Sequence, residues 1–179
     1  SSEAVPSFNR IPEMMRRALR KCFEGRPGVV HIDIPENIMN TKVKCDIAFW
    51  EPHQYRMIEL PKASDYQIER TAQLLTSANF PIIHAGSGVI HSGAKEELKQ
   101  VAEKLQAMVT TSWAGRGALD ENNPLAVSMV HIEANNHVRN DADVVLVLGS
   151  RLGETDWWGK APYWNASQKV IQVDIDPSI

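Results

Sequence analysis

The chain of 179 residues lacks any excess of positive charge. It has 19 Lys and Arg side chains against 22 Asp and Glu, which gives a formal net charge of −3. Proteins that bind nucleic acid need a basic patch or stripe, because contacts to phosphates supply much of their affinity. We therefore expect no nucleic acid among the partners of this protein.

Long hydrophobic runs are also missing. The longest aliphatic stretch, residues 144–148, is far shorter than the roughly 20 apolar residues that cross a bilayer. The N-terminus has no basic segment followed by an apolar one, as a secretion signal would have. We expect neither membrane insertion nor secretion.

Cysteine is scarce as well. Cys22 and Cys45 are too few for a disulfide framework, and they do not form a C-x-x-C pair. This usage is typical of a reducing compartment, so we expect a cytoplasmic protein. There is no internal repeat or low-complexity tract, and at roughly 150 residues per domain the length predicts about one domain.

The first 40 residues predict one helix and one strand. Apolar residues recur at three- and four-residue spacing over residues 12–24, and Gly25 is placed to end the helix. A β-branched run over residues 29–34 follows and Pro35 stops it, so we expect a buried strand. From Glu36 to Pro61 no period is sustained, which is typical of a linker between two units.

Helices and strands alternate in the remainder of the chain. Ser64 and Gln67 form the capping-box pattern of a helix that ends near Asn79. Strands are expected at residues 80–84, 108–111, 144–148 and 169–175, and further helices at residues 94–105 and 127–140. This alternation predicts an open α/β fold with a parallel sheet, and the run 144–148, apolar on both sides, is its central strand, covered by helices on both faces.

Ligands of such sheets bind beyond the carboxyl ends of the strands, so the loops after strands are the candidate sites. Gly86, Ser87 and Gly88 follow the first strand, where backbone N–H groups can approach a phosphate. A tight turn is the alternative. The dinucleotide fingerprint G-x-G-x-x-G is incomplete, because His91 stands at the third glycine position.

Two further loops place polar groups at strand ends. Ser150 and Arg151 follow the central strand, and an arginine between two glycines is suited to bidentate phosphate binding; a surface arginine is the alternative. Asp174 and Asp176 follow the last strand, where their carboxylates can accept hydrogen bonds from ribose hydroxyls or an adenine amine. An Asx-type cap before Pro177 is the alternative there.

No catalytic residue and no metal site is predicted. His131, Glu133 and His137 have the residue types of metal ligands without the spacing of a known site, so we interpret them as solvated. His31 and His84 lie within strand patterns and are expected to be core histidines with satisfied hydrogen bonds.

Aromatic residues crowd one loop, namely Trp157, Trp158, Tyr163 and Trp164. Such a cluster is typical of an oligomer or domain interface, and a stacking platform for a ring is the alternative. A purely structural oligomerisation domain is one hypothesis that rests on it.

Taken in order, these segments resemble the thiamine-diphosphate-dependent enzymes, with the acetolactate synthases and 2-oxo acid decarboxylases as the most similar group. Residues 11–18 and 25–37 resemble the end of the pyrimidine-binding domain of that family. The segments that resemble its central domain are residues 80–88, 110–111, 115–117, 123–125, 141–152 and 170–177.

The resemblance implies a C-terminal remnant of the pyrimidine-binding domain at residues 1–40, a linker at residues 41–61 and a central Rossmann-like domain at residues 62–179. It also implies a parent enzyme that binds thiamine diphosphate and Mg²⁺ between two subunits, with the remaining domains of the parent chain and a homo-oligomer as partners. The activating glutamate of the family would precede Pro12, and no Asp-Gly pair of its metal motif occurs. We expect the fragment alone to be inactive and not to bind this cofactor.

Central domains of this family bind FAD or an ADP-containing ligand in some members and nothing in others. Residues 127–137 contain no glycine, whereas the flavin-dependent members carry a G-x-x-G stretch there, so we expect an empty or ADP-like site. A self-standing FAD-, NAD- or ADP-binding module is the alternative to an enzyme fragment. The candidate contacts are Gly86, Ser87, Gly88, Ser150, Arg151, Asp174 and Asp176.

Overall fold

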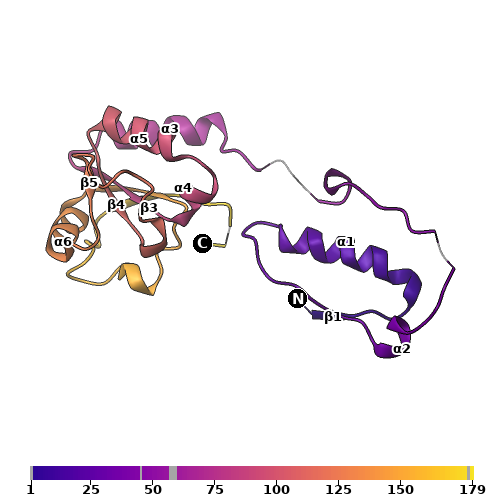
Figure 1. Ribbon diagram of the computed structural model, residues 1–179. Coiled ribbons are helices and arrows are strands. Elements are labelled where there is room, and N and C mark those ends of the chain that lie inside the picture. Colours follow the sequence, from indigo (N-terminus) through magenta and orange to yellow (C-terminus); the bar gives the residue numbers. More distant parts are fainter. Residues whose placement is uncertain (1, 45, 57–59, 177) are drawn as a thin grey trace. The chain divides into compact units, whose positions relative to one another are not determined.

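The computed structural model describes residues 2–44, 46–56, 60–176 and 178–179 (Figure 1). Two sequence predictions, those on Cys45 and on the turn at Pro177, lie outside the described residues. The chain divides into two compact units, unit 1 (Ser1–Lys62 and Ile175–Pro177) and unit 2 (Ala63–Asp174 and Ser178–Ile179). The assignment of residues 1–40, 41–61 and 62–179 to parts of two domains and a linker stays a prediction.

Unit 1 packs one long helix on a two-stranded sheet. Its elements are β1 (Ser2–Ala4), η1 (Phe8–Arg10), α1 (Ile11–Cys22), β2 (His31–Asp33), α2 (Glu36–Met39) and η2 (Pro52–Gln54). β1 and β2 run parallel. A small core of Val5, Met14 and Ile38 lies among these elements, so the apolar spacing predicted for α1 is confirmed as a helix.

The strand predicted at residues 29–34 forms as β2, but the prediction that it is buried was wrong. His31 and Asp33 are exposed, and only Ile32 is half-buried. Burial of a strand needs elements on both of its faces, and β2 belongs to a sheet of two short strands. His31 is therefore not a core histidine; its Nδ1 lies 3.0 Å from the Ser2 Oγ.

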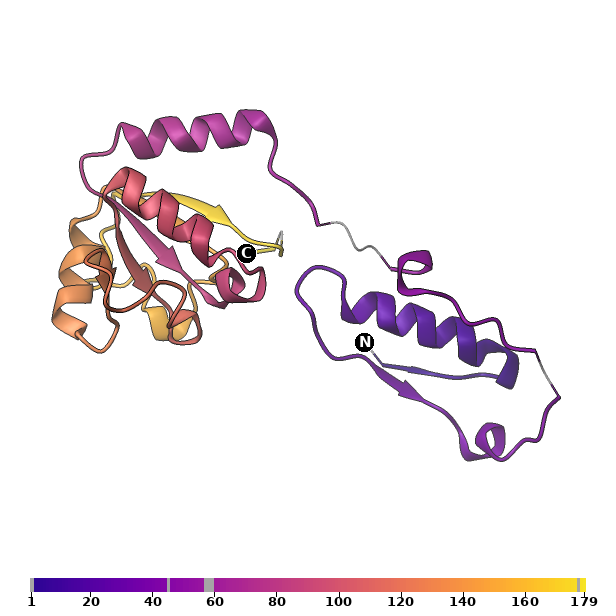
Figure 2. The same ribbon diagram turned by 45° about the horizontal axis from the view of Figure 1, so that its top comes forward.

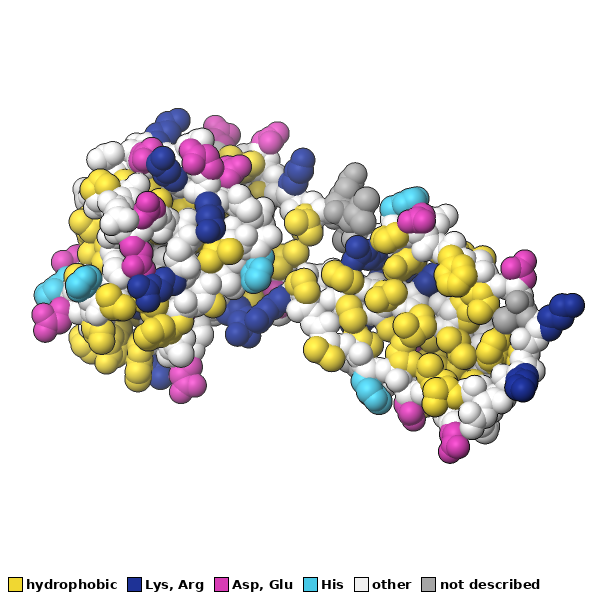
Figure 3. All heavy atoms as spheres, viewed as in Figure 1, with side chains coloured by type: hydrophobic (Ala, Val, Ile, Leu, Met, Phe, Trp, Pro, Cys, Tyr) yellow, Lys and Arg dark blue, Asp and Glu magenta, His cyan; other side chains and the backbone are white. Residues whose placement is uncertain are grey.

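The segment before the second unit contacts α1 through arginines. The Arg16 guanidinium lies 4.2 Å from the ring centroid of Trp50, and that of Arg56 lies 4.1 Å from the ring of Phe23. Cation–π contacts of this kind fix an aromatic ring against a helix. Exposed hydrophobic side chains nevertheless gather on this unit, as Figure 3 shows.

Unit 2 contains one parallel sheet. Its elements are α3 (Asp65–Thr76), β3 (Pro81–Ala85), α4 (Ser87–His91), α5 (Lys95–Leu105), β4 (Met108–Thr111), η3 (Trp113–Gly115), β5 (Ala126–Val127), α6 (Ile132–Asp141), β6 (Val144–Leu148), η4 (Glu154–Asp156) and β7 (Lys169–Val173). The strand order is β5-β4-β3-β6-β7 and every neighbouring pair is parallel. Counted along this unit, the order reverses direction between β3 and β6, which makes this a Rossmann-like fold.

Side chains of the central strands alternate between two apolar cores, as period-two strands require. Ile83 and Leu146 join a core with Leu75 of α3 and Leu98 of α5. Their neighbours in sequence join a second core on the other face, which contains Ile82, Val145, Val147 and Trp164, with Val138 of α6 packed against it. Helices thus cover both faces of the sheet, as Figure 2 shows, and the predicted fold class is confirmed.

The helix α3 confirms its predicted start, but the face that the apolar spacing of Ile68, Ala72 and Leu75 predicts to be buried is only partly buried. The Gln67 backbone N donates to the Ser64 Oγ at 3.3 Å, and the Ser64 backbone N donates to the Gln67 Oε1 at 2.9 Å. Leu75 is 5% exposed, whereas Ile68 is 56% exposed because only the last turns of α3 reach the core. No helix in the described ranges is both long and apolar enough to cross a membrane.

Candidate functional site

The candidate site lies at the carboxyl ends of β3 and β6, where the strand order reverses. Ala85 of β3 pairs with Leu148 of β6, so the loops that follow these strands begin at the same level of the sheet. An open parallel sheet binds its ligands at this position. The structure brings the predicted residues of these two loops together here, namely Gly86, Ser87, Gly88, Ser150 and Arg151.

The glycines of the two loops pack backbone against backbone. The Gly86 N–H donates to the Leu148 carbonyl oxygen at 2.8 Å, and the Gly88 N–H donates to the Gly149 carbonyl oxygen at 3.1 Å. A Cβ atom on Gly86 would lie 2.2 Å from the Gly149 oxygen, and one on Gly88 would lie 2.6 Å from the Gly149 Cα. These two amides, predicted to approach a phosphate, therefore already donate to the last residue of β6 and to the loop that follows it.

Ser150 and Arg151 differ in their exposure. Ser150 is 5% exposed; its Oγ accepts a hydrogen bond from the Leu152 backbone N at 3.2 Å, and its carbonyl oxygen accepts one from the Gln172 Nε2 at 2.9 Å. Arg151 is exposed and Ser87 is half-buried. The two loops thus present an arginine and a serine hydroxyl at the carboxyl end of the sheet, while Ser150 belongs to the interior.

The two aspartates after β7 fall in different units. Asp174 is half-buried and belongs to unit 2, directly after the strand that pairs with β6. Asp176 is grouped with unit 1. The seven predicted residues therefore do not lie within one unit.

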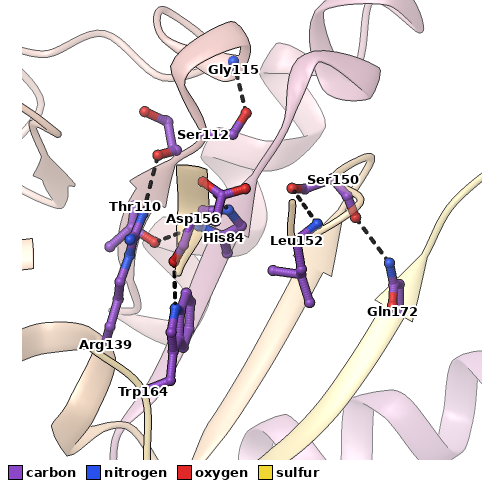
Figure 4. Close-up of polar contacts among 11 residues, drawn as sticks. His84, Thr110, Ser112, Gly115, Arg139, Ser150, Leu152, Asp156, Trp164 and Gln172 are labelled. Carbon is purple, nitrogen blue, oxygen red and sulfur yellow. Dashed lines mark hydrogen bonds and ion pairs between the residues drawn. The ribbon is translucent and has the colours of Figure 1, made fainter. Parts of the chain in front are cut away.

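A buried polar cluster, which sequence reasoning missed, lies under the same end of the sheet. It contains His84, Thr110, Arg139, Asp156 and Trp164, and we call it the His84 cluster (Figure 4). The His84 Nδ1 lies 3.0 Å from the Thr110 Oγ1, and the His84 Nε2 lies 3.7 Å from the Asp156 Oδ1. His84 is thus a core histidine as predicted, but its Nε2 has no hydrogen-bond partner in the part of the chain that is described.

Arg139 and Trp164 complete the cluster. The Arg139 Nη2 donates to the Thr111 carbonyl oxygen at 3.3 Å, and its guanidinium lies 5.0 Å from the centroid of the Trp164 ring. The Trp164 Nε1 donates to the Asp156 carbonyl oxygen at 2.7 Å. These contacts attach α6 and the loop after β6 to the end of β4.

Burial and charge set the protonation of the cluster. Burial lowers the pKa of His84 and outweighs the opposing attraction of Asp156, so the imidazole is neutral at pH 7. Burial raises the pKa of Asp156, but the contacts of its carboxyl group with His84, the charge of Arg139 and the Ser150 hydroxyl together hold it below its usual value. At neutral pH the cluster therefore contains a carboxylate, a guanidinium and a neutral imidazole.

The aromatic loop packs mostly on itself and on the sheet. The Trp158 and Trp164 rings meet at 4.7 Å between centroids, and the Trp157 and Tyr163 rings stack at 5.1 Å. Trp164 is buried, whereas Trp157 is 46% exposed. Its use as an interface stays a prediction.

No group of three or more His, Cys, Asp or Glu side chains that could hold a metal ion occurs within the described ranges. His131, Glu133 and His137 are exposed, as expected for solvated residues.

Comparison with known proteins places this geometry in a family. The family described as "Thiamine pyrophosphate enzyme, central domain" matches residues 68–178. Relatives include a probable acetolactate synthase large subunit of Methanocaldococcus jannaschii, 34% identical over 94% of this chain, and 2-hydroxyacyl-CoA lyase 1 of Dictyostelium discoideum, 32% identical over 96%. Glyoxylate carboligase of Escherichia coli O157:H7 is 28% identical over 94% of the chain. The chain spans only 28–29% of the length of these relatives.

The backbone contact predicts that Gly86→Ala destabilises the fold. The new Cβ would lie 2.2 Å from the Gly149 oxygen, and overpacking of this kind costs about 1–3 kcal/mol or more. Gly153→Ala is the matched control, because a Cβ there meets nothing within 4 Å. Urea unfolding of the two variants measures the difference in their stability. Equal midpoints would contradict the prediction, because they would show that the two loops can separate without lowering the free energy of unfolding.

The buried imidazole predicts that stability falls as the pH falls from 7.5 to 5.5. Burial holds the pKa of folded His84 below the ordinary histidine value of about 6.5, so the unfolded chain binds the proton first. Stability is therefore lost below that pH, at most by about 1.4 kcal/mol per pH unit. His84→Gln should flatten this dependence, whereas His91→Gln, which removes an exposed histidine, should not. Urea unfolding at several pH values measures the slopes, and the same slope in all three proteins would refute the assignment.

Proposed function

Because this chain belongs to the thiamine pyrophosphate enzymes, with residues 68–178 as their central domain, we propose that it is the scaffold of a larger enzyme that forms or breaks carbon–carbon bonds of 2-oxo acids. Thiamine pyrophosphate is the same compound as thiamine diphosphate. The relatives are named as a synthase, a lyase and a carboligase, and their identity to this chain stays between 28% and 34%. Proteins with different substrates share this domain. This supports a role for the domain that does not depend on the substrate.

One observation carries the scaffold role, namely the direct contact between the loops after β3 and β6. The Gly86 and Gly88 amides donate to backbone oxygens across the switch point, so the groups that would bind a ligand's phosphate hold two strands together instead. The contact at the switch point thus serves the cohesion of the sheet.

The described residues do not fit thiamine pyrophosphate and Mg²⁺. Mg²⁺ in such sites is held by carboxylates together with the phosphates of the ligand, and the Gly86 and Gly88 amides that could bind such phosphates already donate to backbone oxygens. We derive no catalytic step for this chain. The proposal places the cofactor and Mg²⁺ on other parts of the parent protein, which would be a cytoplasmic homo-oligomer whose remaining domains contact this segment.

The proposal predicts a difference between this chain and the intact protein that contains it. Calorimetric titration of the chain alone with thiamine pyrophosphate and Mg²⁺ should give no binding heat, whereas the intact protein should bind the cofactor and release CO₂ from a 2-oxo acid such as pyruvate. An intact protein that lacks cofactor binding would contradict the enzyme function. Turnover by the chain alone would contradict the scaffold role.

An ADP-type ligand at the rim of the crevice is the second candidate. Arg151 is exposed and Ser87 is half-buried at the carboxyl edge of the sheet, where a guanidinium and a hydroxyl can bind a phosphate. The interior of the crevice offers less, because Gly86, Gly88 and Ser150 are engaged within the protein.

Titration of the chain with ADP, FAD and NAD tests this candidate. If ADP binds, Arg151→Ala should weaken it about tenfold, since a charge-assisted phosphate contact contributes more than about 1.4 kcal/mol. Arg70→Ala on α3 is the control, because that arginine is also exposed but contacts Tyr66. Silence with all three ligands removes the candidate, and tight NAD binding would favour a self-standing nucleotide-binding module.

A further inference from the structure

Asp156 is a buried acid at the carboxyl end of the sheet. It is 4% exposed and lies at the end of η4, in the loop that follows β6. Its Oδ1 lies 3.7 Å from the Nε2 of His84, which is fully buried near the end of β3 (Figure 4). The carboxylate thus sits where β3 and β6 end side by side.

One buried cation accompanies this carboxylate. Among the described residues, Arg139 and Asp156 are the only buried side chains that carry a formal charge at neutral pH. Arg139 is 6% exposed, and its Nε has no hydrogen-bond partner within the described ranges. A buried charge needs a charge of opposite sign. The charge of Asp156 opposes the lowering of the Arg139 pKa by burial, and the charge of Arg139 in turn lowers the pKa of Asp156, so the two buried charges attract each other.

The fit of Asp156 to its surroundings is incomplete. The contact to His84 is longer than a hydrogen bond, and neither the His84 Nε2 nor the Asp156 Oδ1 has a hydrogen-bond partner in the described chain. The backbone of Asp156 is fixed, because its carbonyl oxygen accepts from the Trp164 Nε1 at 2.7 Å. The Asp156 side chain, held by its backbone, therefore reaches the position beside His84 but leaves the His84 Nε2 without a hydrogen bond.

We propose that this position is an anion site which the chain fills with its own carboxylate. Open sheets with this strand order bind the charged group of a ligand at the switch point, and here the Asp156 carboxylate, beside His84 and Ser150 and near Arg139, takes that place. The class of ligand is a small carboxylate or phosphate anion. In the wild-type chain such an anion is excluded, because it would meet the charge and the volume of Asp156.

Chemical rescue of Asp156→Ala tests the site. The substitution leaves Arg139 without its counter-charge and opens a space of the size of a carboxylate, so formate at pH 7 should raise the Tm of the variant saturably. At a formate concentration about tenfold above the Kd, mass action predicts a rise of about 3–6 °C for a chain of this size. Wild type should show no such rise.

Matched controls separate an anion site from general effects. Formamide has the shape of formate without its charge, and sodium chloride matches the ionic strength, so neither should raise the Tm of Asp156→Ala. Asp156→Asn keeps the side-chain volume and should not respond to formate. Removing the cation as well, in Asp156→Ala with Arg139→Gln, should abolish the response.

Several results would overturn the proposal. These are no rise with formate, an equal rise with formamide or chloride, or a response of Asp156→Asn equal to that of Asp156→Ala. If Asp156→Ala does not fold in chloride buffer, refolding in formate decides the matter. Recovery of the native circular dichroism with formate but not with formamide supports the site, and no recovery refutes it.

Discussion

The backbone contact between the loops after β3 and β6 is the constraint on which unit 2 depends. The strand order reverses between these strands, so the two halves of the sheet meet only along this pair. Gly86, Gly88 and Gly149 let the two backbones approach to distances that no Cβ atom would allow, and two amide hydrogen bonds join the loops. The loops that continue beyond the ends of β3 and β6, including the one that carries Arg151, are positioned by this contact.

The buried charges are the second requirement. Arg139 and Asp156 are buried on one face of the sheet near these loops, and a buried charge is stabilised by a nearby opposite charge. Asp156 belongs to η4 and Arg139 to α6. Their attraction therefore helps to hold these two elements, which cover one face of the sheet, against β3 and β4. Burial keeps His84 neutral by lowering its pKa, and the charge of Arg139 adds to this lowering.

The sequence predicted the features that depend on local pattern and failed on those that depend on tertiary partners. The strands at residues 108–111 and 144–148 were located to the residue, because apolar runs between turns are typical of buried parallel strands. The two-residue β5 has no pattern to detect. His31 was expected in a core because its strand pattern resembles a buried one, but burial depends on how many elements cover the strand.

The same dependence on tertiary partners explains why the sequence predicted only part of the candidate site. It also bears on the role of the family fold in this chain. A G-x-G after a strand predicts backbone approach, and backbone approach occurs, but the partner is the loop after β6 rather than a phosphate. Arg139 and Asp156 are 17 positions apart in a polar helix and an aromatic loop, where no spacing marks a buried pair. In this chain the glycines bring the two loops into direct backbone contact, and Asp156 places a carboxylate beside the end of β3. Relatives named as a synthase, a lyase and a carboligase share this domain, and in this chain the amides predicted to bind a ligand hold the sheet together instead.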